Sequence, residues 1–195
     1  MKKLTLFIAI GLTLAMMQAC NNGAKDSITK TDSTSVTIAD QTRTDSSKTI
    51  ATPDTGTVNF VMAAISGGMV EIAKSKLAMQ QSKNSKITTF ANMMITDHTD
   101  AANKLMVIAK AENITPPTKP DTDQQNQVTD LSKKTGRDFD KAYVKQMIAD
   151  HKKTIILFKN AKKTIKDTTL RLFITSTLPT LHKHLDAIDN IKNGM

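Results

Sequence analysis

Apolar side chains recur every three or four residues along most of this chain, from about residue 58 to its end. This is the spacing that places side chains on one face of an α-helix. Four long helices are predicted in this way, at about 58–81, 86–112, 138–163 and 167–192. No segment alternates apolar and polar residues over the length of a strand, so the sequence predicts an all-α domain over residues 58–195.

The connections between the four helices indicate how they are arranged. The first pair and the second pair are each joined by only a few residues, so the helices within each pair should be antiparallel. Residues 114–127 contain three prolines and are predicted to form a loop, followed by a short helix at 128–134 that ends at Gly136. This long middle crossover is typical of a ferritin-like four-helix bundle, with a simple up-down-up-down bundle as the alternative.

The first nineteen residues have the composition of an export signal. Lys2 and Lys3 precede an apolar run from Leu4 to Met17, which is too short to span a bilayer. Because Cys20 follows directly after Ala19, residues 1–19 resemble a bacterial lipoprotein signal peptide, in which this cysteine carries the lipid. An ordinary secretory signal with an incidental cysteine is the alternative.

Residues 20–57 are predicted to form a lipidated N-terminus and a disordered tether, because they consist mainly of Ser, Thr, Asp, Asn, Lys and Ala without any periodicity. We therefore expect three parts: a signal peptide at 1–19, the tether at 20–57 and a bundle at 58–195. The expected location is the cell envelope, as an outer membrane lipoprotein that faces the periplasm or the cell surface. The membrane would be contacted through Cys20.

The second and third predicted helices share the pattern Met-Ile-x-Asp-His. It spans Met94 to His98 in one helix and Met147 to His151 in the other, and in both an aromatic residue stands eight positions before the histidine. The Met and the His are four residues apart, so they lie on the same helix face. That face is otherwise apolar, which predicts that both histidines are buried in the core.

The other two helices each add one ionisable residue to their apolar face. In the fourth helix the apolar stripe includes His184, and it leaves His182 facing solvent. In the first helix Glu71 lies in a line of small residues that includes Gly67 and Gly68, which would permit a close approach between helices. Glu71, His98, His151 and His184 are therefore expected to meet in the middle of the bundle.

A carboxylate buried without a partner is very costly, so this group must be neutralised by a proton, by hydrogen bonds or by a cation. Three imidazoles and one carboxylate suit a single transition-metal ion such as Zn, Cu or Fe. Met94 and Met147 are candidate additional ligands, against a default role in packing. Asp97 and Asp150 are candidate acceptors for the second nitrogen of an imidazole, against a default of solvated side chains.

Four ordered segments resemble a known family. They are Gly67-Gly68-Met69-Val70-Glu71, Met94-x-x-Asp97-His98, Gly136-x-x-Phe139-Asp140-x-x-Tyr143 with Asp150-His151, and Leu178-Pro179-x-Leu181-x-x-His184-Leu185. In this order they resemble a bacterial envelope family catalogued as a domain of unknown function and labelled "predicted outer membrane protein". The resemblance implies a ferritin-like fold, supplies no established reaction, and carries the family's motif onto Glu71, His98, His151 and His184.

Several function classes are excluded or disfavoured. The chain has two glutamates, Glu71 and Glu112, and neither has a His three residues later, which disfavours a di-iron centre. A single cysteine excludes a thiolate zinc site, and no nucleophile motif is present. The charge of +9 is dispersed, and no nucleic-acid partner is expected. We expect no enzyme, and we weigh a metal-binding bundle against an envelope structural or interaction module whose His and Glu residues form a core hydrogen-bond network.

Overall fold

A computed structural model describes residues 52–195 of the protein. The predicted signal peptide, Cys20 and the tether up to residue 51 lie outside the described residues. The described chain is all-helical, as predicted, and contains no strand. Its helices are α1 (Thr55–Gln81), α2 (Ser85–Ala111), α3 (Thr122–Ser132), α4 (Gly136–Thr164) and α5 (Thr168–Asn193).

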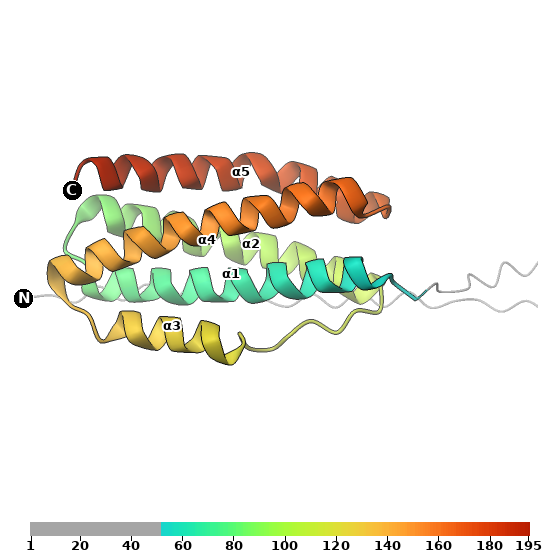
Figure 1. Ribbon diagram of the computed structural model, residues 1–195, viewed down its shortest axis with the longest axis horizontal. Coiled ribbons are helices and arrows are strands. Elements are labelled where there is room, and N and C mark those ends of the chain that lie inside the picture. Colours follow the sequence, from blue (N-terminus) through green and yellow to red (C-terminus); the bar gives the residue numbers. More distant parts are fainter. Residues whose placement is uncertain (1–51) are drawn as a thin grey trace, which may run out of the picture. The chain divides into compact units, whose positions relative to one another are not determined.

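The four long helices form a four-helix bundle, and α3 lies in the crossover between its two halves (Figure 1). α1 and α5 each pack against both α2 and α4, while α3 packs against α1 and α4. The chain returns along the length of the bundle through the crossover, so α2 and α4 run in the same direction (Figure 1). The predicted crossover with its short helix is therefore confirmed, and every long helix is antiparallel to the two it packs against.

α1 and α4 begin earlier than predicted. α1 begins three residues earlier than predicted, because the Asp54 side chain accepts a hydrogen bond from the Thr57 backbone N–H at 3.0 Å. α4 begins at Gly136, which has a positive φ of 55°. Asp138 therefore lies in the first turn of α4, where its charge suits the helix dipole, and Thr135 is the N-cap.

The short helix α3 also differs from its prediction, since it begins at Thr122 and ends at Ser132. Asp121 accepts a hydrogen bond from the Gln124 backbone, and the Gln124 side chain accepts one from the Asp121 backbone. This capping box starts the helix in the middle of the segment predicted to be a loop. The polar sequence that follows has no apolar stripe that would have revealed it.

The core of the bundle has two apolar halves. One half is centred on Phe60, Leu105, Phe158 and Phe173, and the other on Phe90, Met94, Phe139, Tyr143 and Ile188. Glu71, His98, His151 and His184 each fall between the two halves along their own helix. The sequence thus places one polar layer across the middle of an otherwise apolar core.

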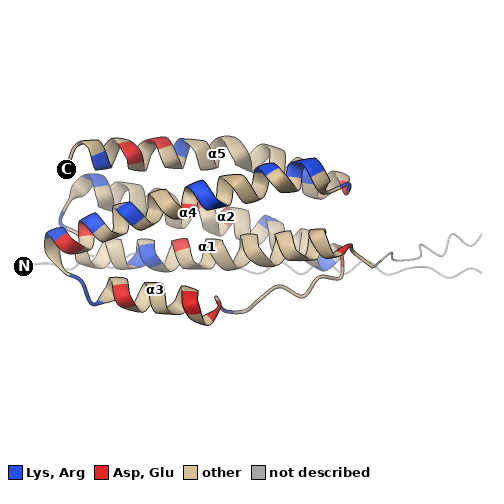
Figure 2. Cartoon of the chain, viewed as in Figure 1, with Lys and Arg blue, Asp and Glu red and all other residues tan. Residues whose placement is uncertain are grey.

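α1 is the most apolar of the long helices, and its length and composition would suffice for a membrane span. In the structure its buried face packs against α2 and α4 and carries the charged residues Glu71 and Lys74. In the view of Figure 2, basic residues recur along α4, acidic residues lie on α3, and most of α1 carries no charge. α1 therefore behaves as a core helix of the bundle.

Candidate metal centre

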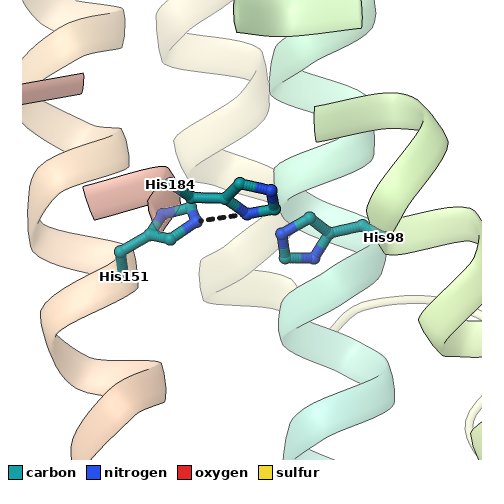
Figure 3. A group of neighbouring side chains, drawn as sticks. All are labelled: His98, His151 and His184. Atoms are coloured by element: carbon teal, nitrogen blue, oxygen red, sulfur yellow. Dashed lines mark hydrogen bonds between the residues drawn. The ribbon is translucent and has the colours of Figure 1, made fainter. Parts of the chain in front are cut away.

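Three of the four predicted residues form a compact group in the polar layer. His98 from α2, His151 from α4 and His184 from α5 are all buried, and one nitrogen from each ring lies within 4.8 Å of one from each other ring. We call these three residues the histidine cluster. Figure 3 shows the rings converging on one point, each reaching it from a different helix.

The outer hydrogen bonds of two rings determine where their protons sit. His151 Nδ1 lies 2.9 Å from the backbone carbonyl oxygen of Met147, which can only accept, so this nitrogen carries the hydrogen. His184 Nε2 donates in the same way to the Asp97 carboxylate at 2.8 Å. In a neutral imidazole the remaining nitrogen is then an acceptor, so His151 Nε2 and His184 Nδ1 each present a lone pair.

These two lone pairs face each other. His151 Nε2 and His184 Nδ1 are 3.4 Å apart, the contact drawn as a dashed line in Figure 3. Two acceptors cannot share a hydrogen bond, but two imidazole nitrogens bound to one tetrahedral Zn²⁺ at about 2.0 Å would lie about 3.3 Å apart. The spacing between the rings therefore matches a pair of ligands on one ion.

His98 supplies the third nitrogen. Its Nε2 has no hydrogen-bond partner among the described residues, although the side chain is only 9% exposed. In Figure 3 the nitrogen of His98 that lies farther from its Cβ is turned toward the other two rings. A buried imidazole nitrogen without a partner is rare in folded proteins, and an ion at the centre of the cluster would satisfy it.

Glu71 lies on the other side of these rings. Its Oε2 is 3.1 Å from His98 Nδ1, and its Oε1 is 3.4 Å from His151 Nδ1. The carboxylate thus contacts the nitrogens that point away from the common centre, as an acceptor that orients metal-bound imidazoles does. This position suits an acceptor that orients His98, and the role of Glu71 as a fourth metal ligand stays a prediction.

Burial shifts the protonation of all four groups toward their neutral forms. It lowers the pKa of His98 to about 3 and that of His151 to about 4, with neighbouring histidines contributing in the same direction. It also lowers the pKa of His184, although Asp97 opposes this. Burial, followed by the Asp150 charge, raises the pKa of Glu71 to about 8. Neutral imidazoles are the form that binds a metal ion.

The two aspartates of the repeated pattern have different roles. Asp97 was predicted as a possible acceptor for an imidazole nitrogen, and it accepts from His184 on α5 rather than from its neighbour His98. Asp150 instead forms an ion pair with Lys74 Nζ at 2.8 Å, and Gln127 of α3 accepts from the same ammonium at 3.1 Å. The two aspartates of the repeated Met-Ile-x-Asp-His pattern therefore do not make the same contact.

Lys74 was missed by the sequence analysis, although it is fully buried. It stands three residues after Glu71 and so shares its helix face, and a lysine on that face was the available signal. One residue further on, Ser75 Oγ lies 3.0 Å from the Tyr143 hydroxyl, and burial raises the pKa of Tyr143. Two further polar pairs therefore flank the polar layer, one buried and one between the buried Lys74 and the partly exposed Asp150.

The remaining predicted residues are placed as follows. Met94 and Met147 are buried in the apolar half of the core that includes Phe90, and the backbone carbonyl of Met147 holds His151. His182 is exposed, as predicted. A methyl group added at Gly67 would meet nothing within 4 Å, and at Gly68 it would meet His98 Nδ1 at 3.9 Å. The two glycines therefore do not mark the close helix approach that we expected.

The fold and this site define a class of protein: a helical bundle with a buried histidine cluster flanked by carboxylates. Residues 39–191 match the family model described as a domain of unknown function, DUF4142, and the chain belongs to that family. Among solved structures, it is similar to the crystal structure of a DUF305 fragment from Deinococcus radiodurans, with a TM-score of 0.66 and 9% sequence identity. That match covers 74% of this chain and 100% of the fragment, and it supports the helical fold alone. No curated protein matches the chain.

Proposed function

We propose that this protein binds one transition-metal ion through His98, His151 and His184. The observation that carries the proposal is the 3.4 Å separation of two imidazole nitrogens whose outer hydrogen bonds leave both of them with lone pairs. Glu71 and Asp97 hold the outer nitrogens of the rings and supply the negative charge that a divalent ion requires. Nitrogen ligands favour Zn²⁺, Cu²⁺ or Fe²⁺ over Mg²⁺ or Ca²⁺.

The alternative function is a structural module in which these residues form only a hydrogen-bond network. That network needs a proton between His151 and His184, which would make one of the two rings an imidazolium. Burial opposes this, because it lowers the pKa of both rings. It would also leave His98 Nε2 without a partner. The metal site accounts for both features, and the network accounts for neither.

Below pH 8 the metal-free Glu71 keeps a proton, because its pKa is raised to about 8. The proton is then shared between Glu71 Oε2 and His98 Nδ1, which are 3.1 Å apart. When an ion binds His98 Nε2, Nδ1 must carry the hydrogen and Glu71 must accept it as a carboxylate. Metal binding is thus coupled to ionisation of the buried glutamate and to the release of one proton to solvent.

We further propose that the bundle is an exported protein anchored by a lipid on Cys20, with an outer membrane location. The residues around Cys20 support this through the cationic start, the short apolar run and the cysteine that directly follows Ala19. The role is then to hold or sense a metal ion at the cell envelope. Metabolic labelling with a fatty acid analogue tests the anchor, and Cys20→Ser should abolish the label.

The test of metal binding uses the purified full chain after treatment with a chelator. Its unfolding temperature is measured with and without an excess of Zn²⁺, Cu²⁺, Fe²⁺ or Mn²⁺, and dialysis gives the number of ions bound. An ion that binds only the folded chain stabilises it by about 4 kcal/mol at a thousandfold excess over its Kd. We expect one ion per chain and a clear rise in the unfolding temperature.

His184→Ala and His182→Ala form a matched pair for this test, because both lie on α5 but only His184 is buried. The comparison uses the rise that the metal produces in each variant, which separates binding from any loss of stability in the metal-free form. His182→Ala should keep the rise and His184→Ala should lose it. Absence of a rise with every ion, or an equal rise in both variants, would leave the structural module as the function.

A further inference from the structure

A cavity of about 270 Å³ lies directly beside the histidine cluster. His98, His184 and Glu71 line it together with apolar side chains that include Leu105, Phe158 and Phe173. Polar side chains, among them Thr154 and Thr177, also contribute to the wall. Residues of α1, α2, α4 and α5 all contribute to the lining. The cavity therefore extends from the cluster to apolar side chains of one half of the core.

The rim of the cavity identifies its opening. Asp100 and Lys104 of α2 and Ser176 of α5 line it and are exposed, so it opens to solvent between these two helices. Asp97 also lines it, but its carboxylate is occupied by His184. A small molecule thus has a path from solvent to the buried end.

Two buried polar atoms at this end lack partners. His98 Nε2 and Glu71 Oε1 have no hydrogen bond among the described residues, and the two residues are only 8% and 2% exposed. Each such atom costs about 1–3 kcal/mol when it is left unsatisfied. An ion on His98 Nε2 would satisfy the first atom. Three histidines leave one position of a tetrahedral shell unfilled.

Gly68 forms part of the cavity wall. An alanine would fit there, since its Cβ would meet only His98 Nδ1 at 3.9 Å, and it would favour the helix by about 1 kcal/mol. The glycine therefore leaves space beside the cluster at a cost to the stability of α1. A ligand that fills this space would explain why a glycine is present despite its cost to helix stability.

We propose that the cavity binds a small organic monoanion with an apolar body, of the class of an aromatic carboxylate. This rests on the proposed metal centre, because the carboxylate head takes the position that three imidazole ligands leave open on a tetrahedral ion. The ring of the ligand lies against Phe158 and Phe173. A cavity of about 150 Å³ lined by apolar side chains holds benzene, so 270 Å³ accommodates a benzene ring together with its head group.

The test uses the full chain loaded with Co²⁺, whose visible absorption reports the number and kind of its ligands. Benzoate and acetate are titrated separately, because they share the carboxylate and differ in the apolar body. We expect benzoate to change the Co²⁺ bands at a concentration at least tenfold lower than acetate. Equal potency of the two anions, or no change with benzoate, would overturn the inference and leave the metal centre intact.

Variants that fill the cavity provide a second test of ligand binding. Ala101→Leu extends a side chain into the cavity from α2, whereas Ala111→Leu on the same helix is exposed. Ala101→Leu should raise the benzoate concentration needed at least tenfold without changing the Co²⁺ bands, and Ala111→Leu should have no effect. Thr180→Leu, on the α5 wall, provides a second filling variant if Ala101→Leu folds poorly. Failure of the unmodified chain to form any Co²⁺ bands would overturn the proposed function itself, and this inference with it.

Discussion

At the scale of single residues, two carboxylates fix the rings of the histidine cluster from outside. Asp97 holds His184 Nε2 at 2.8 Å, and Glu71 holds His98 Nδ1 at 3.1 Å. These contacts decide which nitrogen of His184 and of His98 faces the common centre, and the Met147 carbonyl does so for His151. The geometry of the site therefore depends on side chains that need not touch an ion.

Asp97→Ala should reduce metal affinity by about 10- to 100-fold, because His184 then loses the acceptor that sets its tautomer and orientation. The measurement is a competition titration against a coloured chelator. Asp186→Ala provides the control, since Asp186 is an exposed aspartate on α5. Equal affinities of the two variants would show that Asp97 does not orient the ring.

Lys74 and Asp150 should respond unequally to substitution. Asp150→Ala leaves the fully buried Lys74 ammonium without its carboxylate, which should cost about 3–5 kcal/mol of unfolding free energy. Lys74→Met should cost less, because the Asp150 side chain is 27% exposed and keeps part of its hydration. Urea denaturation measures the unfolding free energy that each variant loses. A larger loss in Lys74→Met than in Asp150→Ala would contradict this account.

The four residues of the predicted site could be selected from the sequence because each one interrupts an apolar stripe at helical spacing. Their roles could not be assigned in the same way. Spacing along one helix does not show which side chain on another helix faces it, so the contact of Asp97 with His184 could not be predicted. Lys74 stands on the face of Glu71, and its pairing with Asp150 also depends on the packing of α1 against α4.

At the scale of the elements, α1 combines a well-formed N-cap with two glycines in its middle. Gly67→Ala should stabilise the protein by about 1 kcal/mol, because the added methyl group meets nothing within 4 Å and alanine favours the helix. Differential scanning calorimetry should show an increase of about 3 °C in the unfolding temperature. An unchanged or lower temperature would mean that the glycine relieves a strain that the structure does not display.

The long helices were predictable to within about three residues, because apolar periodicity defines their middle and caps define their ends. The start of α3 was missed because the residues after Asp121 are almost all polar. The spacing of Asp121 and Gln124 is that of a capping box and was the signal available in the sequence. The start of α3 could therefore be predicted from its capping residues but not from the spacing of apolar residues.

At the scale of the whole molecule, the polar layer should give the metal-free protein a stability maximum near pH 6.5. Below this pH the unfolded chain binds protons on histidines whose folded pKa values are lowered, to about 3 for His98 and about 4 for His151, so stability rises with pH. Above it the folded chain still binds the Glu71 proton up to about pH 8, whereas the unfolded chain has released it. Stability should then fall by about 1.4 kcal/mol per pH unit.

Urea denaturation between pH 5 and pH 8.5, in the presence of a chelator, measures this profile. Glu71→Gln should remove the fall between pH 6.5 and pH 8, because a glutamine does not ionise. Asp150 and Lys74 also act on Glu71, the first raising its pKa and the second lowering it, and both are unchanged in this variant. If the stability of Glu71→Gln still fell between pH 6.5 and pH 8, the group that titrates there would be another residue.

The position of the histidine cluster has a consequence for the mechanics of the chain. Its three members stand at residues 98, 151 and 184, so a shared ion would tie together three distant points of the chain and close two long loops. The chain has one cysteine and so cannot form an internal disulfide. An ion at this point would serve as a removable crosslink, and the bundle would resist forced unfolding when loaded and yield readily once the ion is withdrawn.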